Sequence, residues 1–377
     1  MSLRDRAIGI LLLLIMVPTC AVSTLFRKLR GKTHSPFKFE LLLALSRRTY
    51  LLPISFKRRL RQRDQISRVR QSKRFSKSAT TLCEEVSRAD FTGYWVCKGS
   101  VGSAPPPSQP SKSDVTIIWI HGGGYSSSDA LDCVSQNLRI AELVTARGHS
   151  INIFALQYNL APETCFPEQV NQAAAAYRYL VEEVGIDPAA IVIMGESAGG
   201  HLALSLLYDI AQKGGQPTGC PGMAMLMYPW VNLENSGASF RDNRDKDFLS
   251  KRDLDRCANW VLGKEGRDKF AHLVNFNASL PKGFGWGQVL PPRTWVTVGG
   301  HDLFLADVEE FVDKARGGGA EVEFHVEEGM PHGWLGYHDV MASKRYFGTA
   351  LSEDVSSMMP GAEVLAKVVC DYVSATR

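Results

Sequence analysis

The sequence lacks any Cys-x-x-Cys pair, although eight cysteines are scattered over its 377 residues. Structural zinc sites draw their ligands from closely spaced Cys and His residues, so this scatter argues against such a site. No spacing among the cysteines requires a disulfide, and one would form only in an oxidising compartment. The sequence also contains no internal repeat, which excludes solenoids and propellers.

Acidic residues are scarce in the first 77 positions, where 3 Asp and Glu stand against 19 Lys and Arg. The other 300 residues carry 36 acidic and 24 basic side chains, so a basic N-terminal region joins an acidic body. No aromatic-basic module accompanies the positive charge, which argues against a nucleic-acid partner. We expect a solvated or membrane-facing basic surface, and the sequence indicates no obligate protein partner.

Charge is absent altogether from residues 7–26, "AIGILLLLIMVPTCAVSTLF". As a helix rising about 1.5 Å per residue, this stretch would cross the roughly 30 Å hydrocarbon core of a bilayer. We expect residues 1–32 to form a single-pass membrane anchor with basic flanks, placed in the endoplasmic reticulum. The alternative is a cleaved signal peptide, in which Pro18 ends the apolar core and small residues follow at 21–23.

The side of the membrane that the body occupies stays open. The more basic C-terminal flank of the apolar stretch favours a cytosolic body. A single glycosylation sequon at Asn277 would matter only in a lumen. Three-residue sequons also arise by chance, so the sequon does not decide the topology.

Residues 33–90 mix apolar and basic positions at helix-compatible spacing, first in "FKFELLLALSRRTYLLPISF" and then in "KRRLRQRDQISRVRQSKR". The pattern predicts amphipathic helices that lie on anionic lipid or over the body, as a juxtamembrane or cap region. A semi-ordered linker and a membrane scaffold built on this region are the alternatives.

Residues 91–377 alternate short apolar runs with helical patterns, which predicts an α/β fold with a mainly parallel central sheet and helices on both faces. The expected strands cover residues 91–98, 115–120, 151–157, 191–195, 224–228, 295–298 and 322–326. The expected helices cover residues 133–147, 169–184, 198–212, 307–316 and 363–374. Between residues 232 and 292 the alternation lapses, which indicates an excursion from the sheet that we interpret as part of a lid. Ligand chemistry is expected at the carboxyl ends of the strands.

Residues 195–199, "GESAG", fit the G-x-S-x-G pattern between the strand-like "IVIM" and the helix-like "GGHLALSLL". A sharp strand-to-helix turn forces the central serine into strained backbone geometry, which only small neighbours tolerate. The turn would present Ser197 at a helix N-terminus, whose dipole favours developing negative charge. We therefore predict that Ser197 is a nucleophile.

Three consecutive glycines follow His121 in "IIWIHGGGYSSS", and a second triplet stands at residues 317–319. A plain turn between a helix and a strand explains the second triplet. The first has a further use beside a nucleophilic serine, because glycines let backbone N–H groups approach a ligand without an intervening Cβ. We predict that Gly123, Gly124 and Ala198 donate to an oxyanion, and that His121 anchors the loop.

The serine needs an orienting acid and a histidine base, in the chain order Ser, Asp or Glu, His. His332 stands in the loop after the last expected strand, whereas His325 lies within that strand and His338 follows without a turn. Asp302 comes just past a strand end, and Asp307 lies more than one helical turn further on. We predict His332 as the base and Asp302 as the acid, although Asp302 also suits a helix N-cap.

Five motifs, in order "HGGGY", "YNLAPETCFPEQV", "GESAGGHLAL", "GGHDLFLADVEEF" and "GMPHGW", resemble the hormone-sensitive-lipase-type branch of the α/β-hydrolases. Over residues 115–377 the chain is similar to arylacetamide deacetylases and to fungal steryl acetyl hydrolases, which also begin with a membrane anchor. The resemblance implies an α/β-hydrolase fold with a helical cap, the triad named above and the same oxyanion donors. Two positions depart from the pattern: Glu196 stands where many relatives have Asp, and Leu303 replaces the usual proline.

We therefore predict a serine carboxylesterase that hydrolyses short acyl esters, acetyl esters above all, of hydrophobic alcohols such as sterols or secondary metabolites. The reaction needs no metal or organic cofactor, and no ligand cluster accompanies His301 beside the predicted acid. The alternatives are acyl transfer by the same triad and a non-catalytic ligand receptor with a hydrolase fold. Tyr125, Trp230 and Trp286 are expected either to line the pocket or to pack in the core or lid.

Overall fold

The chain folds around an eight-stranded sheet. This computed structural model describes residues 2–31, 37–61, 64–76, 78, 81–99, 101, 109–214, 219–278, 280 and 284–376. The strands are β1 Glu84–Ser87, β2 Thr92–Cys97, β3 Val115–Ile120, β4 Ile151–Gln157, β5 Ile191–Glu196, β6 Met223–Met227, β7 Arg293–Gly299 and β8 Val322–Glu327. Their order in space is β1-β2-β4-β3-β5-β6-β7-β8. β2 runs antiparallel to both of its neighbours, and every pair from β4 to β8 is parallel. The mainly parallel sheet is confirmed, and each of the seven predicted strands ends within two residues of the observed bounds.

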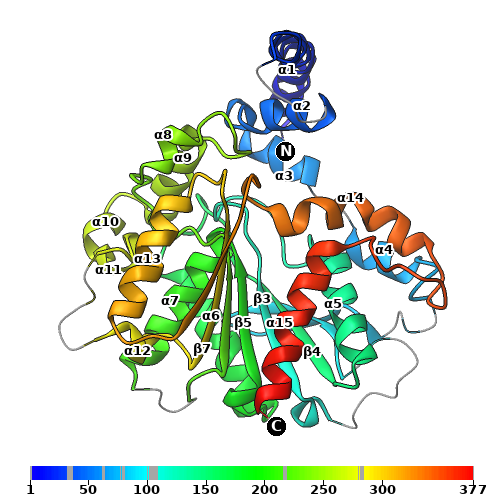
Figure 1. Cartoon of the computed structure of the whole chain (residues 1–377), viewed down its shortest axis with the longest axis vertical. Helices are drawn as coiled ribbons and strands as arrows, with labels where there is room; N and C mark the ends of the chain where they lie inside the picture. The colour runs from blue at the N-terminus through cyan, green and yellow to red at the C-terminus, as the bar shows by residue number, and fades with distance from the viewer. Residues whose placement is uncertain are drawn as a thin grey trace.

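Helices cover both faces of the sheet (Figure 1), as predicted. α5 packs with α14 and α15 on one face, whereas α6, α7 and α13 lie on the other. Their bounds are α5 Val134–Ala146, α6 Glu168–Arg178, α7 Ala198–Gln212, α13 Leu305–Gly317, α14 Trp334–Gly348 and α15 Pro360–Thr376. Single turns lie at η1 Thr49–Leu51, η3 Pro110–Lys112, η4 Tyr179–Glu183 and η5 Pro188–Ala190. Helix α14 was not predicted from the sequence.

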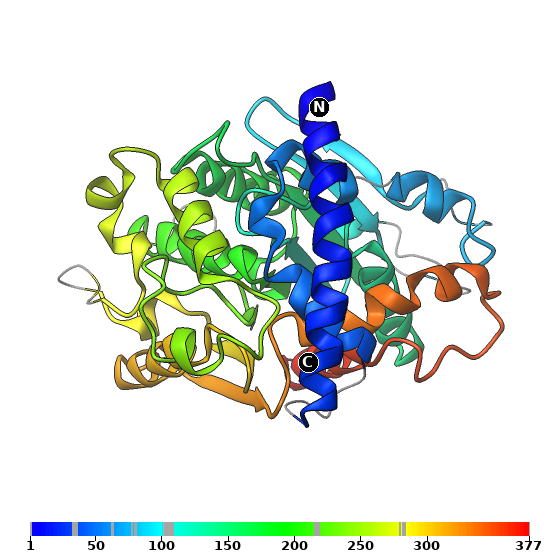
Figure 2. The same cartoon turned by 90° about the horizontal axis from the view of Figure 1, so that it is seen from above.

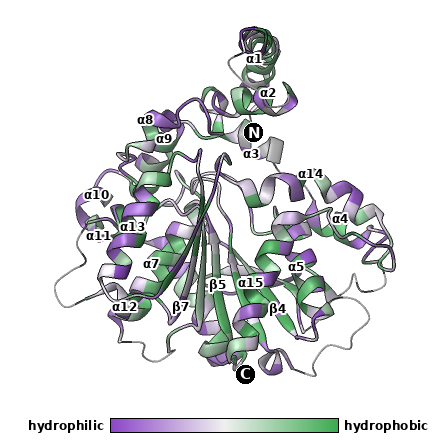
Figure 3. Ribbon diagram, viewed as in Figure 1, coloured by the Kyte–Doolittle hydropathy of each residue, from purple (hydrophilic) through white to green (hydrophobic). Residues whose placement is uncertain are grey.

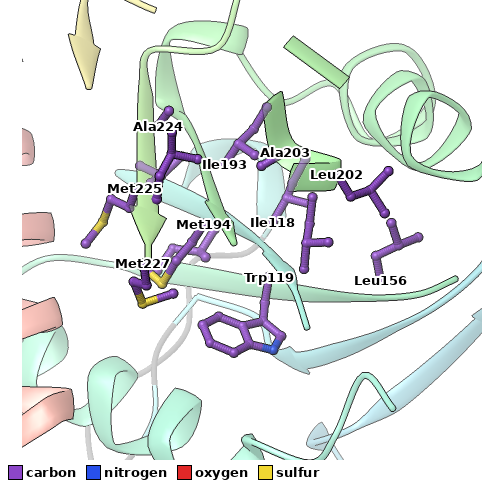
Figure 4. Close-up of a cluster of buried hydrophobic side chains, with 14 of the residues drawn as sticks. Ile118, Trp119, Leu156, Ile193, Met194, Leu202, Ala203, Ala224, Met225 and Met227 are labelled. Atoms are coloured by element: carbon purple, nitrogen blue, oxygen red, sulfur yellow. The ribbon is translucent and has the colours of Figure 1, made fainter. Parts of the chain in front are cut away.

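The centre of the sheet is apolar because helices bury it from both sides. All six residues of β3 and all five residues of β6 are buried. Figure 4 shows Ile118, Ile193 and Met225 of three neighbouring strands in one cluster, which Leu202 and Ala203 of α7 join. Continuous apolar runs are what parallel strands covered on both faces require, which explains why these strands were legible in the sequence.

Between β6 and β7 the chain leaves the sheet, as the lapse in alternation predicted. The segment forms short helices at α8 Ser239–Asp242, α9 Lys251–Leu262, α10 Gly266–Lys269, α11 Ala271–Val274 and α12 Trp286–Val289. The longest, α9, buries Leu254, Cys257 and Val261 on one side and exposes charged residues on the other. This segment brings α9 to the carboxyl ends of the strands, where it contributes to the helical cap.

The basic N-terminal region forms helices α1 Leu3–Leu29, α2 Phe37–Ser46, α3 Ile54–Arg61 and α4 Gln65–Arg70. Figure 1 shows α1, α2 and α3 above the carboxyl ends of the strands, and Figure 2 shows α1 lying lengthwise across the top of the molecule. Buried Arg74 ties the end of this region to Glu142 of α5, with Nε 2.6 Å from Oε1. The predicted helices therefore lie over the body, and the proposed boundaries at residues 32 and 90 remain predictions.

Helix α1 is the one helix in the described part of the chain that is long and apolar enough to cross a membrane. Figure 3 colours much of α1 as hydrophobic, in contrast to the hydrophilic helices α8 and α10. Its outer side exposes large apolar residues: Leu11, Leu14, Ile15, Val22, Leu25, Phe26 and Leu29. Its length and composition make α1 a candidate membrane anchor, and signal sequences meet the same criteria.

Candidate active site

Ser197 occupies a strained turn between β5 and α7. Its backbone angles are φ 54° and ψ −119°, which residues other than glycine seldom adopt. The Ser197 N–H donates to the Met227 carbonyl at 3.0 Å, and the Ser197 carbonyl accepts from the Trp230 N–H at 3.0 Å. The sharp strand-to-helix turn indicated by G-x-S-x-G is therefore present. Ala198 follows directly as the first residue of α7 and is fully buried.

Two glycines of this motif are required by close backbone contacts. A Cβ on Gly195 would lie 2.4 Å from the carbonyl oxygen of Gly199, and a Cβ on Gly199 would lie 2.1 Å from that of Ile120. Real Cβ atoms essentially never approach another heavy atom within 3.0 Å. No side chain fits at either position, so the small residues around Ser197 are a steric necessity.

The loop after β3 brings Gly123 and Gly124 to the same cavity as Ser197. Both glycines have positive φ, 98° and 61° respectively. A Cβ on Gly123 would lie 2.1 Å from the carbonyl oxygen of Ser127, whose N–H closes the turn on the Gly123 carbonyl at 3.1 Å. Position 123 therefore admits only glycine, for reasons of both conformation and space.

His121 holds this loop in place, in agreement with its predicted role. Its ring stacks on that of Tyr158, with the centroids 4.1 Å apart. The Tyr158 hydroxyl donates to the His121 carbonyl at 2.9 Å, and His121 Nδ1 lies 2.8 Å from the Gly122 carbonyl oxygen. The His121 side chain is fully enclosed among these groups and does not line the cavity.

His332 and Asp302 are joined by a hydrogen bond of 2.9 Å between Nδ1 and Oδ2. Asp302 is fully buried, and the His332 ring lies edge-on to Tyr228 with the centroids 4.8 Å apart. Burial by itself lowers the pKa of His332. The negative charge of Asp302, helped by Asp247 and Glu196, outweighs burial and raises the pKa of the imidazole above its ordinary value.

A second buried carboxylate, Asp247, holds the loop that carries His332, and no motif indicated it. Its Oδ1 accepts from the His332 N–H at 3.0 Å, and its Oδ2 accepts from the Leu303 N–H at 2.6 Å. Burial and the nearby charge of Asp302 raise the pKa of Asp247 to about 7. Its place in the charged run "RDNRDKDF" was the only signal available, and that run does not distinguish it from its neighbours.

Ser197 and His332 line one cavity of about 530 Å³ at the carboxyl ends of the strands, together with Gly123 and Gly124. Among the residues described, no hydrogen bond joins Ser197 Oγ to the His332 ring. Hydrogen bonds of this kind in catalytic sites are often long and tighten only when a substrate binds. The structure thus brings the predicted residues around one cavity, with Asp302 behind His332.

The wall of this cavity is largely apolar and comes from parts of the chain that are distant in sequence. The α2 region, the loop before α9, α9 itself and α14 each contribute to it. Its larger apolar and aromatic members are Leu42, Tyr228, Phe248, Leu249, Leu254, Tyr337, Val340 and Met341. None of these residues was singled out in the sequence, because nothing local marks them as neighbours of Ser197.

Tyr125, Trp230 and Trp286, the three aromatic residues considered from the sequence, are buried in the core. None of them lines this cavity. The Tyr125 hydroxyl lies 2.7 Å from His201 Nδ1, and both residues are fully buried. Trp230 Nε1 donates to Asn235 Oδ1 at 2.7 Å, and Trp286 is buried as well. Of the two alternatives left open by the sequence, core packing is the one observed.

The lesser triad candidates lie elsewhere. Asp307 Oδ1 accepts from Asn232 Nδ2 at 2.9 Å, which ties α13 to the excursion after β6. His325 lies on β8, with Nε2 2.9 Å from Glu327 Oε2, and His338 is exposed on α14. Across the described ranges, no three His, Cys, Asp or Glu side chains group as metal ligands.

The sequon asparagine, Asn277, is only 5% exposed. Its side-chain amide donates to the Asp307 carbonyl at 3.0 Å, and Ser279 of the sequon lies outside the described residues. A glycan requires an accessible amide, so this environment argues against modification of Asn277. None of the eight cysteines, all of which lie in described segments, forms a disulfide.

A family model described as the alpha/beta hydrolase fold matches residues 117–336, which include every predicted site residue. The esterase LipI of Mycobacterium tuberculosis is 27% identical over 244 residues, covering 63% of this chain and 71% of that protein. An acetyl-hydrolase of Streptomyces hygroscopicus is 28% identical over 240 residues, covering 63% of this chain and 74% of that protein. Among solved structures, an esterase of the bacterial hormone-sensitive lipase family has a TM-score of 0.64 at 23% identity, over 90% of this chain and all of that one.

Proposed function

This chain belongs to the α/β-hydrolase fold family and is a serine hydrolase of carboxylic esters. On that premise we propose that it is of the hormone-sensitive-lipase type and that Ser197, His332 and Asp302 are its catalytic triad. One observation carries the assignment: the His332 ring shares a cavity with the strained Ser197 and is bound through Nδ1 to buried Asp302 at 2.9 Å. This bond leaves Nε2 as the nitrogen that accepts a proton.

In the proposed reaction, His332 Nε2 takes the proton of Ser197 Oγ as that oxygen attacks the ester carbonyl. The tetrahedral intermediate collapses when the protonated imidazole returns the proton to the departing alkoxide, which releases the alcohol and leaves an acyl-serine. His332 then takes a proton from water as the water oxygen attacks the acyl carbonyl, and it returns that proton to Ser197 Oγ as the carboxylic acid leaves. Asp302 fixes the imidazole tautomer and stabilises its charged form throughout.

We further propose that the backbone N–H groups of Gly123, Gly124 and Ala198 stabilise the oxyanion. The positive φ of both glycines and the absence of a Cβ let the loop approach a substrate closely. Ala198 stands at the N-terminus of α7, where the helix dipole favours negative charge. Each such donor contributes about 10²–10³-fold to the rate in related chemistry.

The proposed substrates are short acyl esters, acetyl esters above all, of hydrophobic alcohols such as sterols or other apolar metabolites. A cavity of about 530 Å³ with a mainly apolar wall supports an apolar alcohol rather than a charged one. The apolar helix α1 packs against α2, which contributes to the wall of this cavity, and this supports a substrate that partitions into lipid. We propose that α1 anchors the enzyme to a membrane. The acetyl preference agrees with the name of the Streptomyces relative, an acetyl-hydrolase.

The test is Ser197→Ala, assayed with p-nitrophenyl acetate and with a longer p-nitrophenyl ester. The substitution should abolish turnover of both esters, because it removes the attacking oxygen. The melting temperature should stay at or above that of the wild type, since the strained turn does not depend on the hydroxyl. Retained turnover in a correctly folded variant would remove Ser197 from the mechanism, and a preference for the longer ester would exclude the acetyl proposal.

A further inference from the structure

A second cavity, of about 450 Å³, lies between the end of α1, the α2 region and the start of α9. It is separate from Ser197 and shares with the active-site cavity only Leu249 and Ser250. Two carboxylates, Glu40 and Asp245, line it. Six cationic side chains line it as well, namely Arg27, Arg47, Arg48, Arg244, Lys251 and Arg252. The cavity is therefore strongly electropositive, and its charges come from three separate stretches of the chain.

The helix dipoles explain only part of this concentration of positive charge. Arg27 lies in the last turn of α1, and Arg47 and Arg48 follow the end of α2, where the helix dipole favours cations. Lys251 and Arg252 instead begin α9, where the same dipole disfavours them. Lys251 pairs with Asp255 one turn further on, and an anion bound at this end of α9 would offset the repulsion that remains between these cations and the helix dipole.

The positive charges of Arg27 and Arg47 repel each other in this cavity. Burial lowers the pKa of Arg47, the carboxylate of Asp245 opposes that effect, and the charge of Arg27 lowers the pKa further. The Nε of Arg27 is enclosed and has no hydrogen-bond partner among the described residues. Two guanidinium groups that repel each other in a partly buried place, one with an unused donor, are stabilised when an anion binds between them.

We propose that this cavity binds a phosphate group, that of an anionic membrane lipid. Arg side chains recognise phosphate oxygens through paired N–H donors, and six cations around one cavity suit a phosphate better than a carboxylate. The cavity lies beside Ser23 and Thr24 of α1, and the same part of α1 exposes Leu25 and Phe26. A headgroup held in the cavity would thus leave its acyl chains next to an apolar surface.

This inference does not depend on the proposed esterase function, because none of the cationic residues lines the active-site cavity. Arg47 has a further role, since its guanidinium donates to the backbone carbonyls of Asp245 and Asp247 and so supports the loop near His332. The test therefore leaves Arg47 unchanged and uses Arg27, which forms no hydrogen bond or ion pair with that loop among the described residues.

The experiment uses the full chain in neutral detergent micelles and counts bound lipid by native mass spectrometry. Dialkyl phosphatidic acid is compared with dialkyl phosphatidylcholine of the same chain length, because ether-linked lipids contain no ester for the enzyme to cleave. We expect one phosphatidic acid to bind in preference to phosphatidylcholine. Arg27→Gln should weaken this binding about tenfold, since it removes one paired donor and one charge.

The matched control is Arg30→Gln, which removes an identical charge three residues further on, from an exposed residue outside the cavity. It should bind like the wild type. Equal losses in the two variants would show diffuse attraction to the basic surface and overturn the site. If Arg27→Gln melts abnormally, Arg252→Gln replaces it, because Arg252 is exposed at the start of α9 and its loss should weaken binding in the same way.

A second arm titrates inorganic phosphate and follows the melting temperature. Stabilisation by inorganic phosphate that Arg27→Gln abolishes, combined with equal binding of the two lipids, would assign the cavity to a soluble phosphate and overturn the lipid source. Preferential binding of phosphatidic acid that depends on Arg27, with or without a response to inorganic phosphate, supports the proposal. No preference between the lipids and no response to phosphate would overturn it altogether.

Discussion

The floor and the roof of the active-site cavity are held together differently. The floor, formed by Gly123, Gly124, Ser197 and His332, comes from loops at the strand ends. The roof comes from the N-terminal helices and α9, which reach the cavity from other parts of the chain. Positive φ and contacts too short for a Cβ fix the floor, whereas charged side chains that donate to backbone carbonyls fix the roof.

Arg58 illustrates how the roof is attached. Its Nε donates to the Ser126 carbonyl at 2.8 Å, its Nη2 donates to the Ala161 carbonyl, and both Nη atoms bind the Glu163 carboxylate at 2.9 Å. One side chain of α3 thus binds two loops of the body. The floor therefore tolerates almost no substitution, whereas the roof depends on a few polar contacts and leaves its wall residues free to vary. We expect floor substitutions to lower kcat and roof substitutions to raise KM.

The largest expected effect is that of Asp302→Asn in the floor. The amide keeps the shape of the carboxylate but favours the wrong imidazole tautomer, so kcat should fall by about 10⁴-fold. The rate of p-nitrophenyl acetate hydrolysis, with the melting temperature as a check on folding, measures this. Asp307→Asn is the matched control, because Asp307 binds Asn232 and does not contact His332. Comparable losses of kcat in the two variants would exclude a special role for Asp302.

The next largest effect should come from Gly123→Ala. Its φ of 98° and the 2.1 Å approach of a Cβ to the Ser127 carbonyl oxygen would displace the loop that carries two of the proposed oxyanion donors. We expect kcat to fall by about 10²–10³-fold, the amount lost with a single oxyanion donor. The measurement is kcat for p-nitrophenyl acetate, with circular dichroism to confirm the fold.

The second glycine triplet supplies the control for this experiment. Gly317 lies at the end of α13, where a Cβ would meet nothing within 4 Å, so Gly317→Ala should leave kcat unchanged. It should also raise stability by about 0.4–1 kcal/mol, because alanine has less conformational freedom to lose. Unchanged kcat in Gly123→Ala would show that the first triplet has no stricter need for glycine than the second.

The floor was largely predictable from the sequence because each part of it has a local sequence signature. Glycine appears where a Cβ does not fit, and His332 follows the last strand as the chain order requires. The strand limits were predictable because strands buried on both faces are continuous apolar runs. The edge strand β1 was not, since Val86 is its only buried residue. Helix α14 was missed because Asp339 and Ser343 are among its buried residues, so apolar positions do not mark its inner face.

The roof could not be predicted in the same way, because tertiary docking determines it. The amphipathic pattern of residues 33–90 indicated helices, but nothing in it showed that Leu42 would face the cavity that contains Ser197. Asp247 is one of several acidic residues in a charged run, and only its burial beside Asp302 distinguishes it. Contacts between distant segments depend on the whole fold, which local patterns do not record.

A roof substitution, Arg58→Ala, should have a moderate effect that falls on KM. Loss of the Arg58 contacts should weaken the docking of α3 by about 1 kcal/mol, since the ion pair with Glu163 is exposed on the glutamate side. That amount corresponds to about a fivefold increase in KM with kcat nearly unchanged. Steady-state kinetics with a short-chain ester separates the two constants. Arg88→Ala, which removes a surface pair with Glu183, should alter neither constant, and a drop in kcat alone for Arg58→Ala would contradict the division between floor and roof.

The smallest effect should be a shift in pH dependence, and it tests the point where roof and floor meet. Asp247 belongs to the excursion that carries α9, its backbone carbonyl accepts from Arg47 at 2.7 Å, and its carboxylate holds the loop of His332. Activity needs a neutral His332, so it should rise with pH through the imidazole pKa. With a pKa of about 7, Asp247 is partly ionised over this range, and its negative charge raises the imidazole pKa. Asp247→Asn should therefore lower the imidazole pKa and move the acidic limb of the kcat profile slightly to lower pH. The control is Asp245→Asn, an exposed neighbour that should leave the limb in place. An unmoved limb in Asp247→Asn would mean that Asp302 alone controls the histidine and that the roof influences the chemistry only through the shape of the cavity.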